Sequence, residues 1–312
     1  MKNNLEYLKT SINSKEKPDI RYMALEYHKE IDDMIIANEK INQLMLTIKK
    51  SKEKNTPCFE SYEKLYKLVL DGYGSKNALN SFINACDSTV ATVKENPESF
   101  KQIVDLYLEY RGIPAQISKE FIQATVDKGA QRSLGKTGEN KVIKIAENSG
   151  FKHAKTISEF FQNDFSITNY TESIKDIINK DLNFGSQNKK LDIIFKIRDS
   201  YAFLEAKHIK ESGGAQDKQI KELIGLLKID AGPNNYMISF MDGVYSNKLL
   251  KLNDNHIDNP KTLLTGKIKN KINRQQYEIL TELKNNKKSF WVNTAGLKSL
   301  IDDFIKTTNN VN

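Results

Sequence analysis

The sequence has only two cysteines, one tryptophan and six prolines among its 312 residues. Cys58 and Cys86 are too few for a disulfide framework and lack the paired spacing of a zinc site, so we expect two reduced thiols. No stretch approaches the roughly 18 to 20 apolar residues that cross a bilayer. The polar start from Met1 to Ser11 lacks the apolar segment of a signal peptide. These absences predict a cytoplasmic protein with no membrane partner.

Motifs for nucleotide chemistry are also missing. The sequence contains no P-loop, no dinucleotide-binding fingerprint and no G-x-S-x-G elbow. Its four histidines are scattered without the spacing of metal ligands. We therefore expect no nucleotide cofactor and no ATP-driven translocation by this chain.

The charge of the chain is unevenly distributed. Residues 1 to 130 carry 19 basic and 19 acidic residues, whereas residues 131 to 312 carry 29 and 21, so the whole net charge of +8 lies in the second part. A basic part joined to a neutral one indicates a polyanionic partner, most commonly nucleic acid. A basic surface that only keeps the protein in solution is the alternative.

Two kinds of pattern divide the chain near residue 130. Before it, apolar residues recur at steps of three and four, as in Met34, Ile41 and Met45, which is typical of helices. After it, a helix from Gly138 to Ser149 precedes short runs rich in β-branched and aromatic residues, with helices between several of them. The predicted strands are Phe165–Asn169, Leu191–Ile197, Tyr201–Ile209, Tyr236–Phe240 and Phe290–Val292, and the later helices are Gln216–Lys228 and Thr294–Phe304. We predict an all-helical region over 1–130 and an α/β domain over 131–312, in which helices flank a mixed central sheet.

Charged residues interrupt two adjacent apolar strands. The turn at residues 198–200 joins these strands into a hairpin, and it brings Asp192 near Glu205 and Lys207. Because side chains alternate along a strand, Glu205 and Lys207 lie on one face, and His208 lies on the other. The alternative is a solvated ion pair on an exposed edge strand. If instead the three groups converge, two carboxylates and a lysine meet at one end of the sheet.

Such a group suits phosphodiester hydrolysis. Carboxylates bind a hard divalent cation, which activates water and withdraws charge from a phosphate, while a lysine stabilises developing negative charge. Glu139 heads the apolar stripe of the helix expected from Gly138, where it supplies a third acidic group. The alternative for Glu139 is a first-turn acid that only complements the helix dipole.

A glycine-containing loop follows the second strand of the hairpin. Residues 211–215 read Glu-Ser-Gly-Gly-Ala, and a helix with polar side chains begins after them. The amides and side chains at a helix start can meet a phosphate. We expect DNA contacts from residues on both sides of the hairpin, namely Lys189, Lys190, Gln216, Lys218 and Gln219.

Asp192 and Glu205-Ala206-Lys207, with twelve residues between them, resemble the motif of the PD-(D/E)XK nucleases, with Leu191 in place of the proline of the motif. The helix at Glu139 resembles the one that presents a further acidic residue in many of these nucleases. The chain is also similar to type II restriction endonucleases, especially the GATC-cutting kind with a helical N-terminal region. That similarity includes residues 74–77, the Ser-Gly-Gly loop, residues 237–243 and residues 290–304.

The resemblance implies a fold, a reaction and a site. The fold is restriction-endonuclease-like, and the reaction is Mg²⁺-dependent cleavage of a specific double-stranded DNA sequence that leaves a 5′ phosphate. Asp192, Glu205 and Glu139 would bind Mg²⁺, Lys207 would be the catalytic lysine, and a prokaryotic homodimer would cut both strands, because a palindromic site matches a symmetric protein. Two alternatives stay open: a resolvase-like repair or recombination nuclease, and a non-catalytic DNA-binding protein with a nuclease-like fold.

Overall fold

The computed structural model describes residues 1–18, 30–70, 76–129, 134–178, 191–265 and 270–309. The chain divides into two compact units. The first contains Met1–Asp19 and Ser133–Asn312, and the second contains Ile20–Arg132. The second unit is therefore an insertion in the sequence of the first.

The inserted unit is helical in its described parts. Its elements are α2 (Ile31–Glu53), α3 (Phe59–Leu70), α4 (Ala78–Ile83), the 3₁₀ helix η2 (Asn84–Cys86), α5 (Val90–Glu95), α6 (Pro97–Tyr110) and α7 (Lys119–Gly129). The expected stripe on α2 is buried, since Ile41, Met45 and Ile48 are each at most 2% exposed and pack with α3 and α6. Burial of one apolar stripe per helix holds this unit together.

The other unit is built on a six-stranded mixed sheet in the order β1-β2-β3-β4-β5-β6. The strands are β1 (Lys152–His153), β2 (Phe165–Thr168), β3 (Ile193–Ile197), β4 (Ser200–His208), β5 (Tyr236–Asp242) and β6 (Ser289–Val292). The pairs β2–β3 and β3–β4 are antiparallel, and β1–β2, β4–β5 and β5–β6 are parallel. The expected strands are all present, and β4 lies inside the sheet between β3 and β5.

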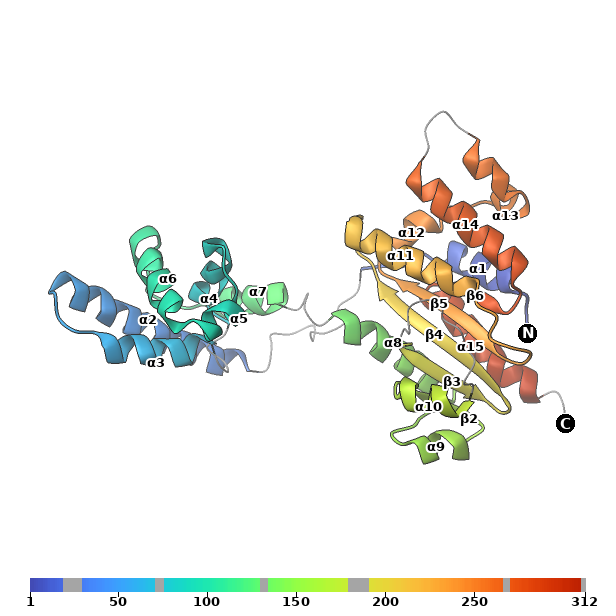
Figure 1. Ribbon diagram of the computed structural model, residues 1–312, viewed down its shortest axis with the longest axis horizontal. Helices are drawn as coiled ribbons and strands as arrows, with labels where there is room; N and C mark the ends of the chain where they lie inside the picture. The colour runs from blue at the N-terminus through green and yellow to red at the C-terminus, as the bar shows by residue number, and fades with distance from the viewer. Residues whose placement is uncertain (19–29, 71–75, 130–133, 179–190, 266–269, 310–312) are drawn as a thin grey trace. The chain divides into compact units, whose positions relative to one another are not determined.

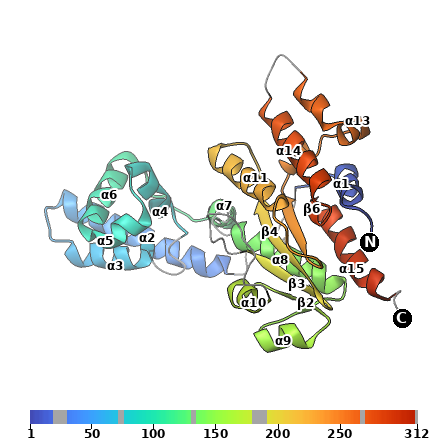
Figure 2. The same cartoon turned by 45° about the vertical axis from the view of Figure 1, so that its right-hand side comes forward.

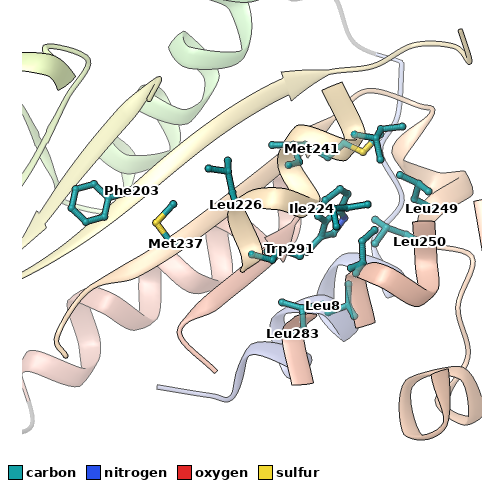
Figure 3. Close-up of a cluster of buried hydrophobic side chains, with 14 of the residues drawn as sticks. Leu8, Phe203, Ile224, Leu226, Met237, Met241, Leu249, Leu250, Leu283 and Trp291 are labelled. Carbon is teal, nitrogen blue, oxygen red and sulfur yellow. The ribbon is translucent and has the colours of Figure 1, made fainter. Parts of the chain in front are cut away.

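Helices cover both faces of this sheet (Figures 1 and 2). On one face, α11 (Gly214–Leu227) and α14 (Lys271–Asn285) pack on a cluster that contains Phe203, Met237 and Trp291, which Figure 3 shows in detail. On the other face, α8 (Leu134–Asn148) and α15 (Thr294–Asn309) cover a second cluster. The remaining helices are α9 (Ile157–Gln162), α10 (Thr171–Ile178), α12 (Ser246–Leu249), α13 (Asp254–Asp258) and the 3₁₀ helix η4 (Pro260–Leu264). The predicted α/β class, with a mixed sheet flanked by helices and a helical region in the N-terminal half, is confirmed.

The expected boundary at residue 130 is wrong for the start of the chain. Helix α1 (Asn4–Asn13) belongs to the sheet unit, where it contacts β6 and α15. Tyr7 enters one apolar cluster and Leu8 enters the other, so α1 closes the sheet at the β6 edge. Gly296 allows the close approach, because a Cβ there would lie 2.0 Å from the Ser11 hydroxyl. Local periodicity identified the helix type but carried no information about this distant partner.

The helix expected to open at Gly138 begins earlier, at Leu134. Glycine usually weakens a helix interior, which is why the sequence suggested a start there. In the structure Gly138 is buried against β4, and a Cβ at this position would lie 3.7 Å from that of Ala206. Gly138 therefore lies inside α8, at its contact with β4, and does not mark the start of the helix.

None of the helices in the described part of the chain is both long and apolar enough to cross a membrane.

Candidate active site

The β3–β4 hairpin brings Asp192 next to the Glu205-Ala206-Lys207 segment. Asp192 occupies the bend before β3, and its Oδ2 accepts a hydrogen bond of 2.8 Å from the Ala206 amide. The register continues from the pair Ile193–Leu204, so Asp192 lies opposite Glu205. The sequence-based expectation that the turn returns the second strand to Asp192 is confirmed.

Glu205 is buried in the interior of the sheet. It is 1% exposed, and the Lys207 Nζ donates a hydrogen bond of 2.5 Å to its Oε1. The Lys207 side chain is partly accessible, at 18%. The alternative of a solvated pair on an edge strand is therefore wrong, because β4 has neighbours on both sides. Burial of a carboxylate is costly unless other groups compensate its charge, so this position is a candidate for function.

The two carboxyl groups influence each other. Burial, and next the charge of Glu205, raise the pKa of Asp192 to about 6. The Ala206 amide and the charge of Lys207 oppose this rise, while the charge of Glu139 adds to it. Removal of these groups from water and their proximity both disfavour two simultaneous negative charges. A bound cation would remove this penalty.

Glu139 lies on α8 at the same end of the sheet. The helix begins five residues earlier, and its first turn holds no acidic residue, so the alternative of a first-turn acid for Glu139 is wrong. Its neighbour Gly138 packs against Ala206, between the two charged residues of β4. Glu139 is half-buried there, and its charge acts on Asp192.

The donor chemistry of these residues suits a hard divalent cation. Asp192 and Glu205 offer carboxylate oxygens, the ligands that Mg²⁺ prefers, and the pKa of Asp192 is raised by burial first and by the charge of Glu205 second. Within the described residues, no three Asp, Glu, His or Cys side chains converge closely enough to form a ligand group. The structure thus brings Asp192 and Glu205 together, with Glu139 nearby but outside a closed set of three.

Three of the five residues expected to contact DNA lie in the described part of the chain. Gln216, Lys218 and Gln219 lie in the first two turns of α11, a few residues after the end of β4. Lys218 is exposed and both glutamines are partly exposed. Lys189 and Lys190 lie outside the residues that the structure describes. The helix start is therefore close in the chain to Lys207, as the sequence suggested.

One cavity, of about 630 Å³, is lined by residues of η4 and α14 and of the chain beside them. Its lining residues are Leu263, Leu264, Asn270, Lys271, Arg274, Tyr277 and Glu278. None of them belongs to the expected site, so this cavity is separate from the carboxylate pair.

Sequence reasoning missed a set of charged residues on the opposite face of β4. Lys141 on α8 lies 3.6 Å from a Glu16 carboxylate oxygen and 3.5 Å from Asp242, which in turn lies 3.6 Å from the His208 ring. The alternation that sends His208 away from Lys207 is confirmed. Only the charged end of β5 at Asp242 hinted at this set in the sequence, because its members come from four separate segments.

Comparison with known protein families gives a match. A protein-family model described as Tsp45I type II restriction enzyme matches residues 31–262, which include Glu139, Asp192, Glu205 and Lys207. A search of curated proteins found no match. The family match covers most of the chain, and the fold agrees with it. The chain therefore belongs to the Tsp45I type II restriction enzyme family and is a sequence-specific restriction endonuclease that acts on DNA.

Proposed function

We propose that this restriction endonuclease hydrolyses phosphodiester bonds of double-stranded DNA with Mg²⁺, at a PD-(D/E)XK site formed by Asp192, Glu205 and Lys207, with Glu139 beside them. The observation that carries the proposal is the buried Glu205 carboxylate, with the Lys207 ammonium at 2.5 Å and the half-buried Asp192 beside it in the hairpin. The site lies inside the matched region.

Each residue has a distinct task in this proposal. Asp192 and Glu205 hold the cation, and Glu139 contributes a further carboxylate from α8. When bound, Mg²⁺ supplies Lewis-acid activation of water and neutralisation of phosphate charge. Lys207 provides an ammonium that stabilises negative charge developing on the phosphate, and its contact with Glu205 orients it toward the same end of the sheet.

The assembly and the products follow from the same proposal. We expect a homodimer, because a two-fold symmetric protein matches a palindromic site and cuts both strands. We also expect cleavage that leaves a 5′ phosphate, and DNA contacts from Gln216, Lys218 and Gln219 at the start of α11. A cytoplasmic location fits a protein whose substrate is DNA.

The test is digestion of unmethylated phage DNA by the wild-type protein and by Glu205→Gln, with Mg²⁺ or Ca²⁺. Glu211→Gln serves as the matched control, since Glu211 is exposed in the loop after β4. We expect discrete bands with Mg²⁺, and a cleavage rate reduced roughly 100-fold or more in Glu205→Gln because one carboxylate ligand of the cation is lost. Glu211→Gln should cut like the wild type.

Two results would contradict the proposal. One is full activity of Glu205→Gln, and the other is cleavage that does not depend on a divalent cation. Parallel assays on a four-way DNA junction and on linear DNA distinguish a restriction endonuclease from a resolvase-like nuclease. Cleavage of the junction alone would favour the resolvase-like nuclease. Sedimentation equilibrium tests the dimer, and a monomer at micromolar concentration in the presence of site-containing DNA would contradict it.

A further inference from the structure

Four charged or titratable residues form a cluster under the end of β4, which we call the Lys141 cluster: Glu16, Lys141, His208 and Asp242. The Lys141 ammonium lies between two carboxylates, 3.6 Å from Glu16 and 3.5 Å from Asp242. Asp242 also lies 3.6 Å from His208 Nδ1. The cluster therefore links α8, β4, β5 and the segment after α1.

The cluster is withdrawn from solvent. The side chain of Asp242 is 0% exposed, that of Glu16 is 5% exposed, and that of Lys141 is 19% exposed. Buried carboxylates require a compensating charge, and loss of one partner leaves an uncompensated charge inside the protein. Lys141 compensates Glu16 and Asp242 together, so its removal would affect both.

The cluster holds the end of β4, directly beside Lys207. His208 is the next residue after Lys207 and is paired with Asp242 in the β4–β5 register. The Ile209 amide then donates a 2.8 Å hydrogen bond to the Asp242 carbonyl oxygen. These contacts fix the direction in which the chain leaves the catalytic strand.

The cluster also holds α8 above the same strand. Lys141 follows Glu139 by two residues on this helix, and Gly138 packs against Ala206 of β4. A lateral shift of α8 would break the contacts of Lys141 and move Glu139 away from Asp192. The two ion pairs of Lys141 thus connect α8, which carries Glu139, to the ends of the strands beside Lys207.

We infer that Lys141 is a positioning residue for catalysis, which locks α8 to the ends of β4 and β5 so that Glu139 and Lys207 meet Asp192 and Glu205. This inference rests on the proposed function of those four residues. It assigns a role to a side chain on the face of the sheet opposite Glu205, where it takes no part in the chemistry itself.

The test compares Lys141→Met with Lys144→Met, since Lys144 is an exposed lysine one turn or less away on the same helix. We expect Lys141→Met to lower the single-turnover cleavage rate about 10- to 100-fold, the size typical of residues that orient metal ligands, and to raise the Mg²⁺ concentration at half-maximal rate. DNA affinity measured in Ca²⁺ should be unchanged. Lys144→Met should resemble the wild type, and Lys141→Arg should recover most of the rate because it keeps the charge.

Further variants distinguish a positioning role of Lys141 from a loss of folding and from an error in the proposed active site. If Lys141→Met fails to fold, the triple variant Lys141→Met/Glu16→Gln/Asp242→Asn removes both uncompensated charges, and it should fold yet cleave as slowly as expected for Lys141→Met. A wild-type rate and Mg²⁺ midpoint in either variant would overturn the inference. An unshifted Mg²⁺ midpoint in a slow variant would also overturn it, since that pattern indicates general destabilisation. If Glu205→Gln is fully active in the same assay, the proposed site is wrong and the inference falls with it.

Discussion

The structure alters the acid–base chemistry of the Asp192 carboxyl group. Its pKa rises to about 6, mainly through burial and secondly through the charge of Glu205. Without a cation, the folded protein binds a proton at Asp192 more tightly than the unfolded chain does. By linkage, this residue favours folding most below pH 3.8, and its contribution is lost as the pH rises through about 6.

Asp192→Asn should therefore stabilise the metal-free protein at pH 7.5. In EDTA we expect its free energy of unfolding to exceed that of the wild type by about 1 to 3 kcal/mol, because the rise of the Asp192 pKa to about 6 disfavours the charged carboxylate in the folded state. The difference should vanish at about pH 3, where the carboxyl group is protonated in both the folded and the unfolded state. Denaturant unfolding at both pH values measures it.

Asp199→Asn is the control, because Asp199 is exposed in the β3–β4 turn. This variant should show no pH-dependent gain. Mg²⁺ should stabilise the wild type and leave Asp192→Asn unaffected, since the variant lacks a ligand. A lower stability of Asp192→Asn in EDTA at pH 7.5 would argue against the charge repulsion described above.

Gly243 is required by the backbone at the end of β5. Its φ is +93°, and a Cβ there would lie 2.5 Å from the Ile209 carbonyl oxygen. We expect Gly243→Ala to destabilise the protein by about 2 to 5 kcal/mol, through backbone strain and overpacking. Gly225→Ala is the contrast, because Gly225 is exposed within α11 with open space around it, and it should stabilise the protein by about 0.5 to 1 kcal/mol. Thermal or denaturant unfolding distinguishes the two, and a neutral Gly243→Ala would refute the expected clash.

At the scale of helices and strands, local sequence patterns predicted most of the elements, but they did not predict contacts between residues far apart in the sequence. The hairpin of β3 and β4 was predictable because alternating residues bury both of its faces, as in Ile193, Ile194 and Phe195. Asp192, Glu205 and Lys207 stood out because charges interrupt those apolar runs. The start of α8 was not predictable, because Gly138 lies inside this helix in spite of the usual cost of glycine. Lys141 and Glu16 were missed because no local pattern reports a partner more than a hundred residues away.

Asn293 joins two helices that are far apart in the sequence. Its Oδ1 accepts hydrogen bonds from the Ala295 and Gly296 amides at the start of α15, and its Nδ2 donates to the Ser11 and Ser14 carbonyl oxygens. Asn293→Ala removes a helix cap and leaves buried groups without partners. We expect a loss of about 2 to 4 kcal/mol.

Asn253→Ala provides the comparison for this loss. Asn253 caps α13 through the His256 amide but is exposed, so only about 0.5 to 1 kcal/mol should be lost. Equal effects of the two variants in denaturant unfolding would show that Asn293 acts only as a cap and does not hold α1.

At the scale of the whole molecule, the helical unit is continuous in sequence while the sheet unit is not. A fragment of residues 31–129 contains the full apolar cluster of α2, α3 and α6. We expect this fragment to fold alone, with a helical circular dichroism spectrum and a cooperative thermal transition. Deletion of residues 1–18 should instead prevent stable folding of the sheet unit, because α1 closes its β6 edge. A fragment that stays unfolded would contradict the independence of the helical unit.

The discontinuity also sets an order of events during synthesis. The Asn4 side chain binds the carbonyl oxygen of Ser289, 285 residues later. At a synthesis rate of about 5 to 20 residues per second, roughly 15 to 60 seconds pass between the synthesis of α1 and that of Ser289. The helical unit can fold during this interval, but the sheet that carries the carboxylate pair closes only when the final strand and helix arrive. In a nascent chain the carboxylate pair of Asp192 and Glu205 therefore reaches its complete sheet only after β6 and α15 have been made, long after the helical unit.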